Sequence, residues 1–205
     1  MLLNFDNIIK NYNLKIKGVL HIGAHYGQEH IEYLIHNIHN IIYFEPLKNN
    51  FNVLLKNIQF GETIKAYNIA LGNFEGEIDM FVETTNQGIS SSILEPDKHL
   101  TQYPGIVFDK KETVLINKLD NIQYDRNLFN LINIDVQGYE LEVFKGATKS
   151  LEYIDYIITE INRDTLYKNC VQENELDLFL SNFAFVRVET FWAGGTWGDA
   201  LYIKQ

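Results

Sequence analysis

The chain has 205 residues, of which 27 are acidic and 17 are basic, so its formal net charge is −10 with neutral histidines. This charge disfavours a general nucleic-acid binder, because affinity for phosphates needs clustered lysine and arginine. The single cysteine, Cys170, excludes a disulfide framework and a cysteine metal cluster. No apolar run approaches the roughly 18 residues of a membrane span, and the first residues do not resemble a secretory signal. We therefore expect one cytoplasmic domain over residues 1–205.

The first third of the chain predicts alternating strands and helices. Short apolar runs indicate strands, and apolar residues three or four positions apart indicate helices. Helices are expected at 2–12, 28–38 and 49–57, and strands at 18–22, 40–46 and 64–71. Histidines 30, 36 and 39 fall on or just after the second helix, where we expect them to face solvent.

The middle of the chain lacks this alternation of strands and helices. Strands are expected at 77–83 and 113–119, and between them lies a polar stretch, 84–111, with two prolines. A segment of this length without strong periodicity inside a compact domain is usually functional or mobile. We expect it to shape a binding site.

Alternation resumes in the last third. The pattern predicts strands at 131–135, 156–160, 185–190 and 200–204, and helices at 139–151 and 173–182. The final two strands have no room for a crossover helix between them, so they must be antiparallel. The remaining alternation predicts an α/β fold with a doubly wound, mostly parallel sheet and helices on both faces.

A glycine turn follows the first expected strand. Gly23 and Gly27 flank it directly before a helix, where a ligand can approach the backbone closely. An ordinary turn that needs a left-handed residue explains the glycines equally well. Glu45 ends the next strand and favours ligand binding, because an acidic residue there accepts hydrogen bonds from ribose hydroxyls. The Gly-x-x-x-Gly spacing departs from the dinucleotide fingerprint and favours S-adenosylmethionine (SAM) over a dinucleotide.

Several blocks resemble the FkbM family of SAM-dependent methyltransferases. They are Val19–Glu29, Phe44-Glu45-Pro46, Ala70-Leu71-Gly72, Leu119-Asp120, Ile134–Ala147, Thr159-Glu160 and Gly198–Leu201. The block at 134–147 is the most specific. The resemblance covers nearly the whole chain. It implies a class I (Rossmann-like) methyltransferase fold, with a mostly parallel seven-stranded sheet, an antiparallel C-terminal strand and a short N-terminal helix.

The resemblance also implies site residues. Expected cofactor contacts are His21, Gly23, Ala24, His25 and Gly27 around the methionine part of SAM, Glu45 and Pro46 at the ribose, Asn68 and Ala70 at the adenine, and Asp135 at the reacting centre. Two positions depart from the family pattern: His21 stands where many members have aspartate, and Gln137 replaces a glutamate. The second departure weakens, without excluding, a Mg²⁺ site at this loop, since hard cations prefer carboxylate oxygens.

Methyl transfer to a hydroxyl needs a base, for which Asp135 is the first candidate and Glu160 the second. A helix cap for Asp135 and a salt bridge for Glu160 are the structural alternatives. For the acceptor we expect Ser90, Ser91 and Ser92 in the long polar segment, with Tyr103, Trp192 and Trp197 suited to stacking on a sugar. Loop hydrogen bonds and core packing explain these residues almost as well. Cys170 lacks an activating neighbour and is expected to be inert.

These features predict a SAM-dependent O-methyltransferase that acts on a hydroxyl of a sugar or glycoconjugate. The polar insertion and the absence of a membrane-seeking face favour a sugar. The alternatives are a lipid or another small-molecule hydroxyl as the acceptor, and a catalytically silent SAM-binding module. We expect a small molecule or glycan as partner and no nucleic acid, and the sequence leaves a homo-oligomer open.

Overall fold

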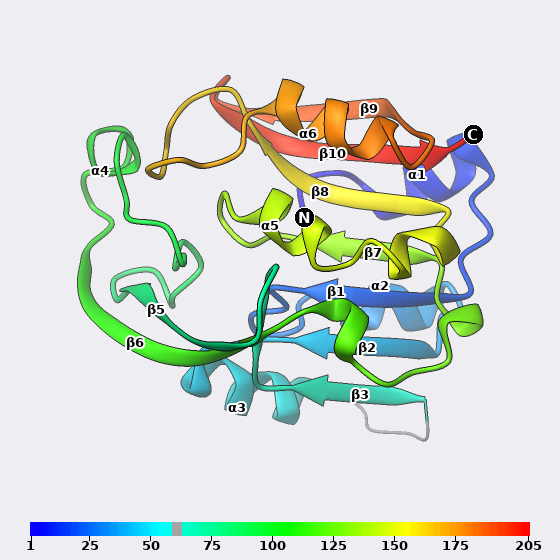
Figure 1. The fold of residues 1–205 in the computed structure, drawn as a ribbon, viewed down its shortest axis with the longest axis horizontal. Coiled ribbons are helices and arrows are strands. Elements are labelled where there is room, and N and C mark those ends of the chain that lie inside the picture. The colour runs from blue at the N-terminus through cyan, green and yellow to red at the C-terminus, as the bar shows by residue number, and fades with distance from the viewer. Residues whose placement is uncertain (59–62) are drawn as a thin grey trace.

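The computed structural model describes residues 1–58 and 63–205, and within them the chain forms a seven-stranded sheet (Figure 1). From one edge to the other the strands are β3 (Ile64–Tyr67), β2 (Asn40–Phe44), β1 (Gly18–Ile22), β7 (Leu131–Ile134), β8 (Tyr156–Asn162), β10 (Trp197–Lys204) and β9 (Phe185–Ala193). Strand β10 runs antiparallel to both of its neighbours, and the pairs from β3 to β8 are parallel. This confirms the expected class I methyltransferase topology.

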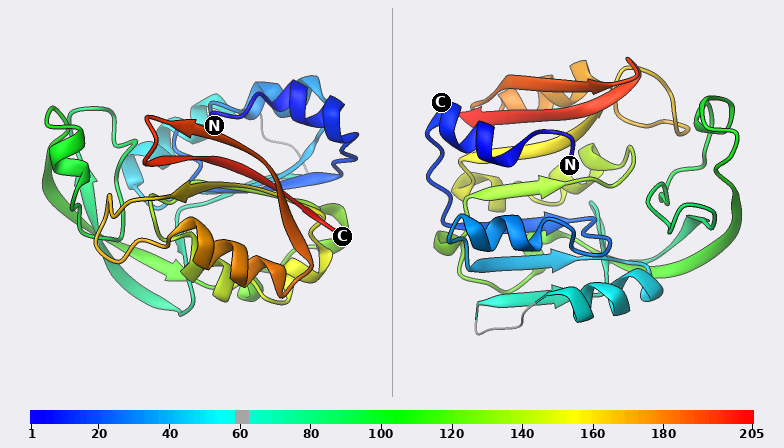
Figure 2. Two further views of the ribbon diagram at one scale, coloured as in Figure 1. Left: turned by 90° about the horizontal axis from the view of Figure 1, so that it is seen from above. Right: turned by 180° about the vertical axis from the view of Figure 1, so that it is seen from behind.

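Helices cover both faces of the sheet (Figure 2). One face carries α1 (Phe5–Tyr12), α2 (His30–Ile35) and α3 (Lys48–Asn57), and the other carries α5 (Glu140–Lys145) and α6 (Glu173–Ser181). Short 3₁₀ turns lie at η1 (Leu119–Asn121) and η2 (Arg126–Leu128), before β7, and at η3 (Ser150–Tyr153), between α5 and β8. None of the helices in the described residues is long and apolar enough to cross a membrane.

The core is split by the sheet into two layers. Successive strand residues point to opposite faces, so Leu20 and Ile22 pack toward α5 and α6 while Val19 packs toward α1 and α2. All five residues of β1 are buried. This explains why the central strands read as continuous apolar runs, which is typical of parallel sheets covered on both faces.

The structure corrects several expected boundaries. The strand expected at 64–71 breaks after Tyr67, and β4 (Ala70–Leu71) leaves the main sheet to join β6 (Phe108–Asn117) and β5 (Gly76–Glu83) in a second sheet of three strands among the described residues. The break lies at Asn68, whose side-chain amide donates to the carbonyls of Glu45 and Pro46. Strand β6 begins five residues earlier than expected. The helix expected at 139–151 ends at Lys145, and η3 follows.

The expectation for His30 was wrong. Its side chain is buried, and its Nδ1 lies 2.8 Å from the hydroxyl of Tyr43 on the neighbouring strand. His36 is partly buried and its Nε2 lies 2.7 Å from Asp6. His30 therefore helps to pack α2 on the sheet, and His36 joins the end of α2 to α1.

The small sheet and the polar segment lie at the end of the main sheet where β1, β2, β7 and β8 finish (Figure 1). Within that segment α4 (His99–Gln102) is a single short helix. Carboxyl ends of parallel strands are the usual place for ligand sites in open α/β sheets. The fold thus brings the candidate residues together at the carboxyl ends of the central strands.

Candidate functional site

The glycine turn after β1 closes tightly against β2 and β7. Gly23 and Gly27 have φ angles of +77° and +72°, in the left-handed region that favours glycine. The amides of Gly23 and Ala24 both donate to the carbonyl of Phe44, at 2.9 and 3.0 Å. A Cβ on Gly23 would lie only 1.9 Å from the carbonyl oxygen of Asp135. The glycine is therefore required by the packing of the strand ends themselves, in addition to any ligand.

Glu45 is buried at the tip of β2. One carboxylate oxygen accepts from the amide of His25 at 2.8 Å, and the other from the amide of Leu47 at 2.9 Å. Burial raises the pKa of Glu45 to about 8, and these two hydrogen bonds offset only part of that effect. Each oxygen keeps a lone pair for a further donor, such as one hydroxyl of a vicinal diol.

Three adjoining cavities surround this turn in the described part of the chain. The first is mostly apolar and is lined by Glu45, Pro46, Ile69, Ala70 and Val136, among others. An apolar slot with one carboxylate at its side suits a nucleoside. Asn68 does not line this cavity. Its side-chain amide donates instead to the backbone carbonyls of Glu45 and Pro46. Ile69 occupies the place on the wall that the sequence suggested for Asn68.

The second cavity lies beyond the glycine turn and is polar. It is lined by His21, His25, Glu29, Asn133, Thr159, Glu160 and Asp199, with Gly23, Ala24 and Asp135. His21 is buried; its Nδ1 lies 3.2 Å from the hydroxyl of Tyr33, and its Nε2 lies 3.9 Å from Glu29. Burial lowers the pKa of His21, so at neutral pH it lines the cavity as an uncharged imidazole.

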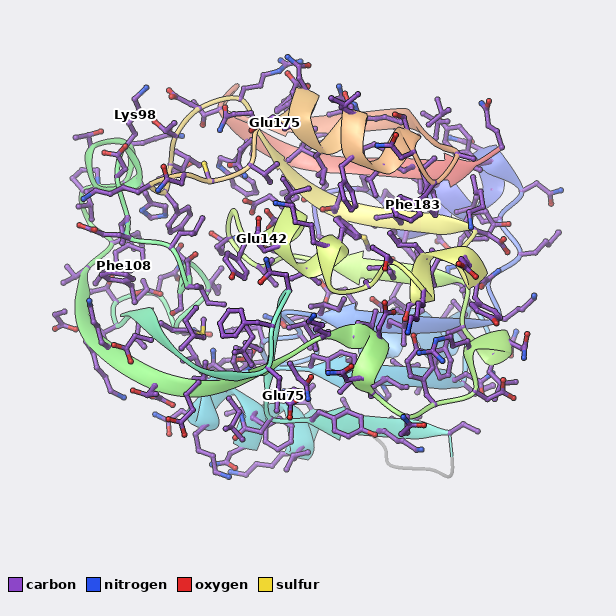
Figure 3. All side chains as sticks on the ribbon, viewed as in Figure 1. Glu75, Lys98, Phe108, Glu142, Glu175 and Phe183 are labelled. Carbon is purple, nitrogen blue, oxygen red and sulfur yellow. The ribbon has the colours of Figure 1, made fainter. Side chains whose placement is uncertain are left out.

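The third cavity lies under the polar segment. It is lined by Ser90, His99, Tyr103, Ile106, Leu166 and Trp197, with Asp135, Gln137 and Glu160 at its base. The indole Nε1 of Trp197 donates to the hydroxyl of Tyr103 at 2.8 Å, which fixes both rings. His99 packs against Phe108, which Figure 3 labels on this side of the molecule, with ring centroids 5.2 Å apart.

The other expected acceptor residues lie elsewhere. Trp192 contributes to none of these three cavities and packs under the guanidinium of Arg163, 3.5 Å from the ring centroid. Ser91 lines the first cavity. Ser92 is fully buried and donates to the carbonyl of Gln137 at 2.8 Å, which ties the polar segment to the end of β7. The structure therefore places Ser92 and Trp192 outside the walls of these three cavities.

Gln137 joins the two candidate bases. Its side-chain nitrogen lies 2.7 Å from Asp135 and 2.8 Å from Glu160, so both amide hydrogens are donated to carboxyl groups. Its side-chain oxygen lies 2.9 Å from the hydroxyl of Tyr167, whose single hydrogen is shared between this oxygen and the carbonyl of Ser90 at 2.7 Å. With φ of 55°, Gln137 also adopts the left-handed backbone that lets the loop turn back here. The amide orientation is thus fixed from both ends.

The carboxyl groups around this amide differ in exposure. Asp135 is exposed and lines all three cavities, whereas Glu160 is buried. Burial, followed by the charge of Asp135, raises the pKa of Glu160 well above its usual range. Burial also raises the pKa of Glu140 to about 7 and that of Asp199 to about 6. Glu160 is therefore the carboxyl group that favours the protonated form, and Asp135 is the one that is accessible from the cavities.

A metal does not fit this arrangement. Within the described residues no group of three or more histidine, cysteine or acidic side chains is placed to hold a metal ion. Asp135 and Glu160 are bridged by an amide nitrogen, which is a donor where a cation would need an oxygen ligand.

The sequence reasoning missed the bridging role of Gln137, the anchor Tyr167, and the cavity residues Thr159 and Asp199. Asn133 and Ile69 were missed as well. Ile89 belongs to the polar segment that was expected to shape the acceptor site, and it lines all three cavities. The one available signal was the position of Thr159 and Asp199 within blocks that carry the family resemblance. Cys170 is buried, as expected, and burial raises the pKa of its thiol.

Solved structures with this architecture include methyltransferases at low sequence identity. Magnesium protoporphyrin IX methyltransferase from Synechocystis, with bound SAM, covers 97% of this chain and 74% of its own at TM-score 0.55 and 9% identity. The N-methyltransferase NodS from Bradyrhizobium japonicum covers 94% and 88% at TM-score 0.54 and 11% identity. At such identity these likenesses support the fold alone.

Curated relatives match parts of the chain. The 2-O-methyltransferase NoeI of Sinorhizobium fredii is 30% identical over 115 residues, which is 52% of this chain and 47% of the relative. The hexuronic acid methyltransferase AglP of Haloferax volcanii is 46% identical over 33 residues, which is 16% of this chain and 14% of the relative. The matches thus span less than half the length of either relative. The profile of the methyltransferase FkbM domain matches residues 21–187, and the chain therefore belongs to the FkbM methyltransferase family.

Proposed function

We propose that this protein is a SAM-dependent O-methyltransferase that acts on a sugar hydroxyl. One observation carries the proposal. The exposed side chain of Asp135 lines both the first cavity, with Glu45, and the third cavity, with Tyr103. A methyl donor and an acceptor bound in these cavities would meet at Asp135. In-line transfer needs this meeting of two ligands at one general base.

The residues of the first two cavities fit SAM. The apolar wall at Ile69 and Ala70 suits the adenine, and Glu45 has free lone pairs for the ribose diol. The polar second cavity, next to Gly23 and Ala24, suits the amino-acid end. When bound, SAM supplies an electrophilic methyl group on a sulfonium.

The chain's own residues then have distinct tasks. Asp135 would accept the proton of the acceptor hydroxyl; bound SAM would supply the methyl group, with its carbon–sulfur bond breaking as the carbon–oxygen bond forms and S-adenosylhomocysteine as the leaving group. Gln137 holds Asp135 through a hydrogen bond of 2.7 Å, and Tyr167 holds Gln137. Glu160, which carries a proton, presents no competing negative charge and helps to fix the same amide. A base placed in this way contributes about 10²- to 10⁴-fold to a rate.

The sugar part of the proposal rests on two supports. The names of the relatives NoeI and AglP give 2-O-methylation and hexuronic acid methylation. The third cavity combines aromatic rings with hydrogen-bonding groups, and rings of this kind offer an apolar face and a polar edge to a pyranose.

The test has two stages. Calorimetry with S-adenosylhomocysteine first establishes cofactor binding, with Glu45→Ala as the variant expected to bind at least about tenfold more weakly. Incubation of the protein with SAM and pools of glycans, lipids and small hydroxyl compounds follows, with methylated products identified by mass spectrometry. Products confined to the lipid pool would replace the sugar with a lipid acceptor. Cofactor binding without any product would favour a silent SAM-binding module.

A further inference from the structure

The walls of the two cavities next to Asp135 carry negative charge without a balancing side chain. No lysine or arginine is among the described residues that line them. Asp135 lines both cavities, Glu29 and Asp199 line the second, and Glu160 lines both as a protonated, uncharged carboxyl group. The ammonium group of Met1, which also lines the second cavity, is paired with Glu29 at 3.1 Å. Burial lowers the pKa of both His21 and His99, so these rings add no positive charge at neutral pH. An anion that enters the third cavity therefore meets Asp135 and no cationic side chain among the described lining residues.

The cationic side chains that lie within a few residues of the lining residues along the chain are already engaged in ion pairs. Lys98 forms an ion pair with Asp164 and, as Figure 3 shows, projects outward from the loop of α4. Lys168 pairs with Glu95 at 2.7 Å. Arg163 pairs with Glu173 at 2.7 Å while its guanidinium covers the ring of Trp192. Turning any of these side chains toward the third cavity would break an existing contact.

The groups that do face the third cavity suit an uncharged polar ring. Tyr103 and Trp197 contribute aromatic surface to the cavity wall, and the hydrogen bond of 2.8 Å from the indole to the phenol hydroxyl holds them together. Asn86 and Ser90 add neutral donors and acceptors, and Ile106 and Leu166 add apolar surface. This is the composition expected where a neutral ring with hydroxyl groups is recognised.

We infer that the acceptor ring of this enzyme is a neutral sugar, and that the site rejects uronic acids and other anionic sugars. The inference rests on the proposed function and narrows its substrate class. A carboxylate on the sugar would approach Asp135 with no lysine or arginine of the cavity wall to pair it, which is a like-charge juxtaposition that selects against the wrong ligand. In this respect the protein would differ from its relative AglP, whose name specifies hexuronic acid.

The experiment compares matched pairs of sugars on the protein saturated with S-adenosylhomocysteine. The pairs are the methyl glycosides of glucose and glucuronic acid, and of galactose and galacturonic acid. Binding is measured by ligand-observed NMR titration at pH 7.5 and low salt. We expect at least one neutral sugar to bind. Its uronate partner should bind at least about tenfold more weakly.

Two variants control for charge. Ile106→Lys places a cation on the cavity wall outside the proposed catalytic groups, and Ile106→Met changes the same side chain without charge. The lysine variant should narrow the gap between each neutral sugar and its uronate, and the methionine variant should not. Equal or stronger binding of the uronates by the parent protein would overturn the inference, as would binding of neither member of any pair.

Failure of this inference and failure of the proposed function have different signatures. If the uronates bind better, methyl transfer to a glycan pool can still be observed, and only the charge preference is wrong. If neutral sugars bind but no glycan is methylated, the charge preference stands and the proposed transfer fails.

Discussion

Glu45 should make cofactor affinity depend on pH. In the free protein, burial raises its pKa to about 8, so the carboxyl group is largely protonated at pH 7 and below. Two ribose hydroxyls that donate to it would stabilise the ionised form and lower the pKa in the complex. Binding at neutral pH therefore releases a proton, and affinity falls as the pH falls below 8.

The size of the effect follows from the free-state pKa. The fraction of protein with ionised Glu45 is about one half at pH 8 and about one hundredth at pH 6. If the complex keeps Glu45 ionised over this range, S-adenosylhomocysteine should bind about 50-fold more weakly at pH 6 than at pH 8.

The assay is calorimetry from pH 6 to pH 9 in pairs of buffers with different ionisation enthalpies. The difference between buffers gives the number of protons released, which should be close to one at pH 6 and close to zero at pH 9. Glu45→Gln keeps the shape of the side chain but cannot titrate, so its affinity should be lower at pH 8 and much less dependent on pH. An equal pH dependence in both proteins, or no proton release at pH 6, would refute the reasoning.

Three further predictions address the rest of the site. Asp135→Asn should leave S-adenosylhomocysteine affinity within a few-fold of the parent and slow methylation by about 10²-fold or more; normal turnover would leave Asp135 a structural residue. Gln137→Glu removes both donated hydrogen bonds and adds a third carboxyl group, so the pH–rate profile should move to higher pH by about one unit. An unchanged pH–rate profile would show that Gln137 does not position Asp135. Gly23→Ala places a Cβ 1.9 Å from a carbonyl oxygen at a φ of +77°, so it should lower the free energy of unfolding by about 2 kcal/mol or more, measured as a fall in melting temperature. Gly105→Ala, where a Cβ would meet nothing within 4 Å, is the matched control and should leave the melting temperature almost unchanged.

The sequence by itself determined the order of the elements and the family. Its strands and helices follow from spacings of two, three and four residues, and these patterns depend on neighbours along the chain. The glycine turn and Glu45 could be found for the same reason, since turn chemistry and the end of a strand are local. The antiparallel last pair followed from the short connection between its strands.

The tertiary structure decided how distant groups meet. The bridge from Asp135 through Gln137 to Glu160 joins two strands, and no local pattern specifies which amide reaches which carboxylate. The choice of Trp197 over Trp192 for the aromatic cavity likewise depends on the pairing of β9 with β10, which places one indole against Tyr103 and the other under Arg163.

The protonation of the site is also a tertiary property. A glutamate in an extended chain has an ordinary pKa, and in the folded protein burial, followed by the charge of Glu112, raises the pKa of Glu45 to about 8. The departure of β4 from the main sheet has a similar origin, because the side chain of Asn68 bonds to carbonyls more than 20 residues earlier in the chain. Spacing along the chain encodes which element forms, whereas desolvation and long-range hydrogen bonds depend on which elements the fold brings together.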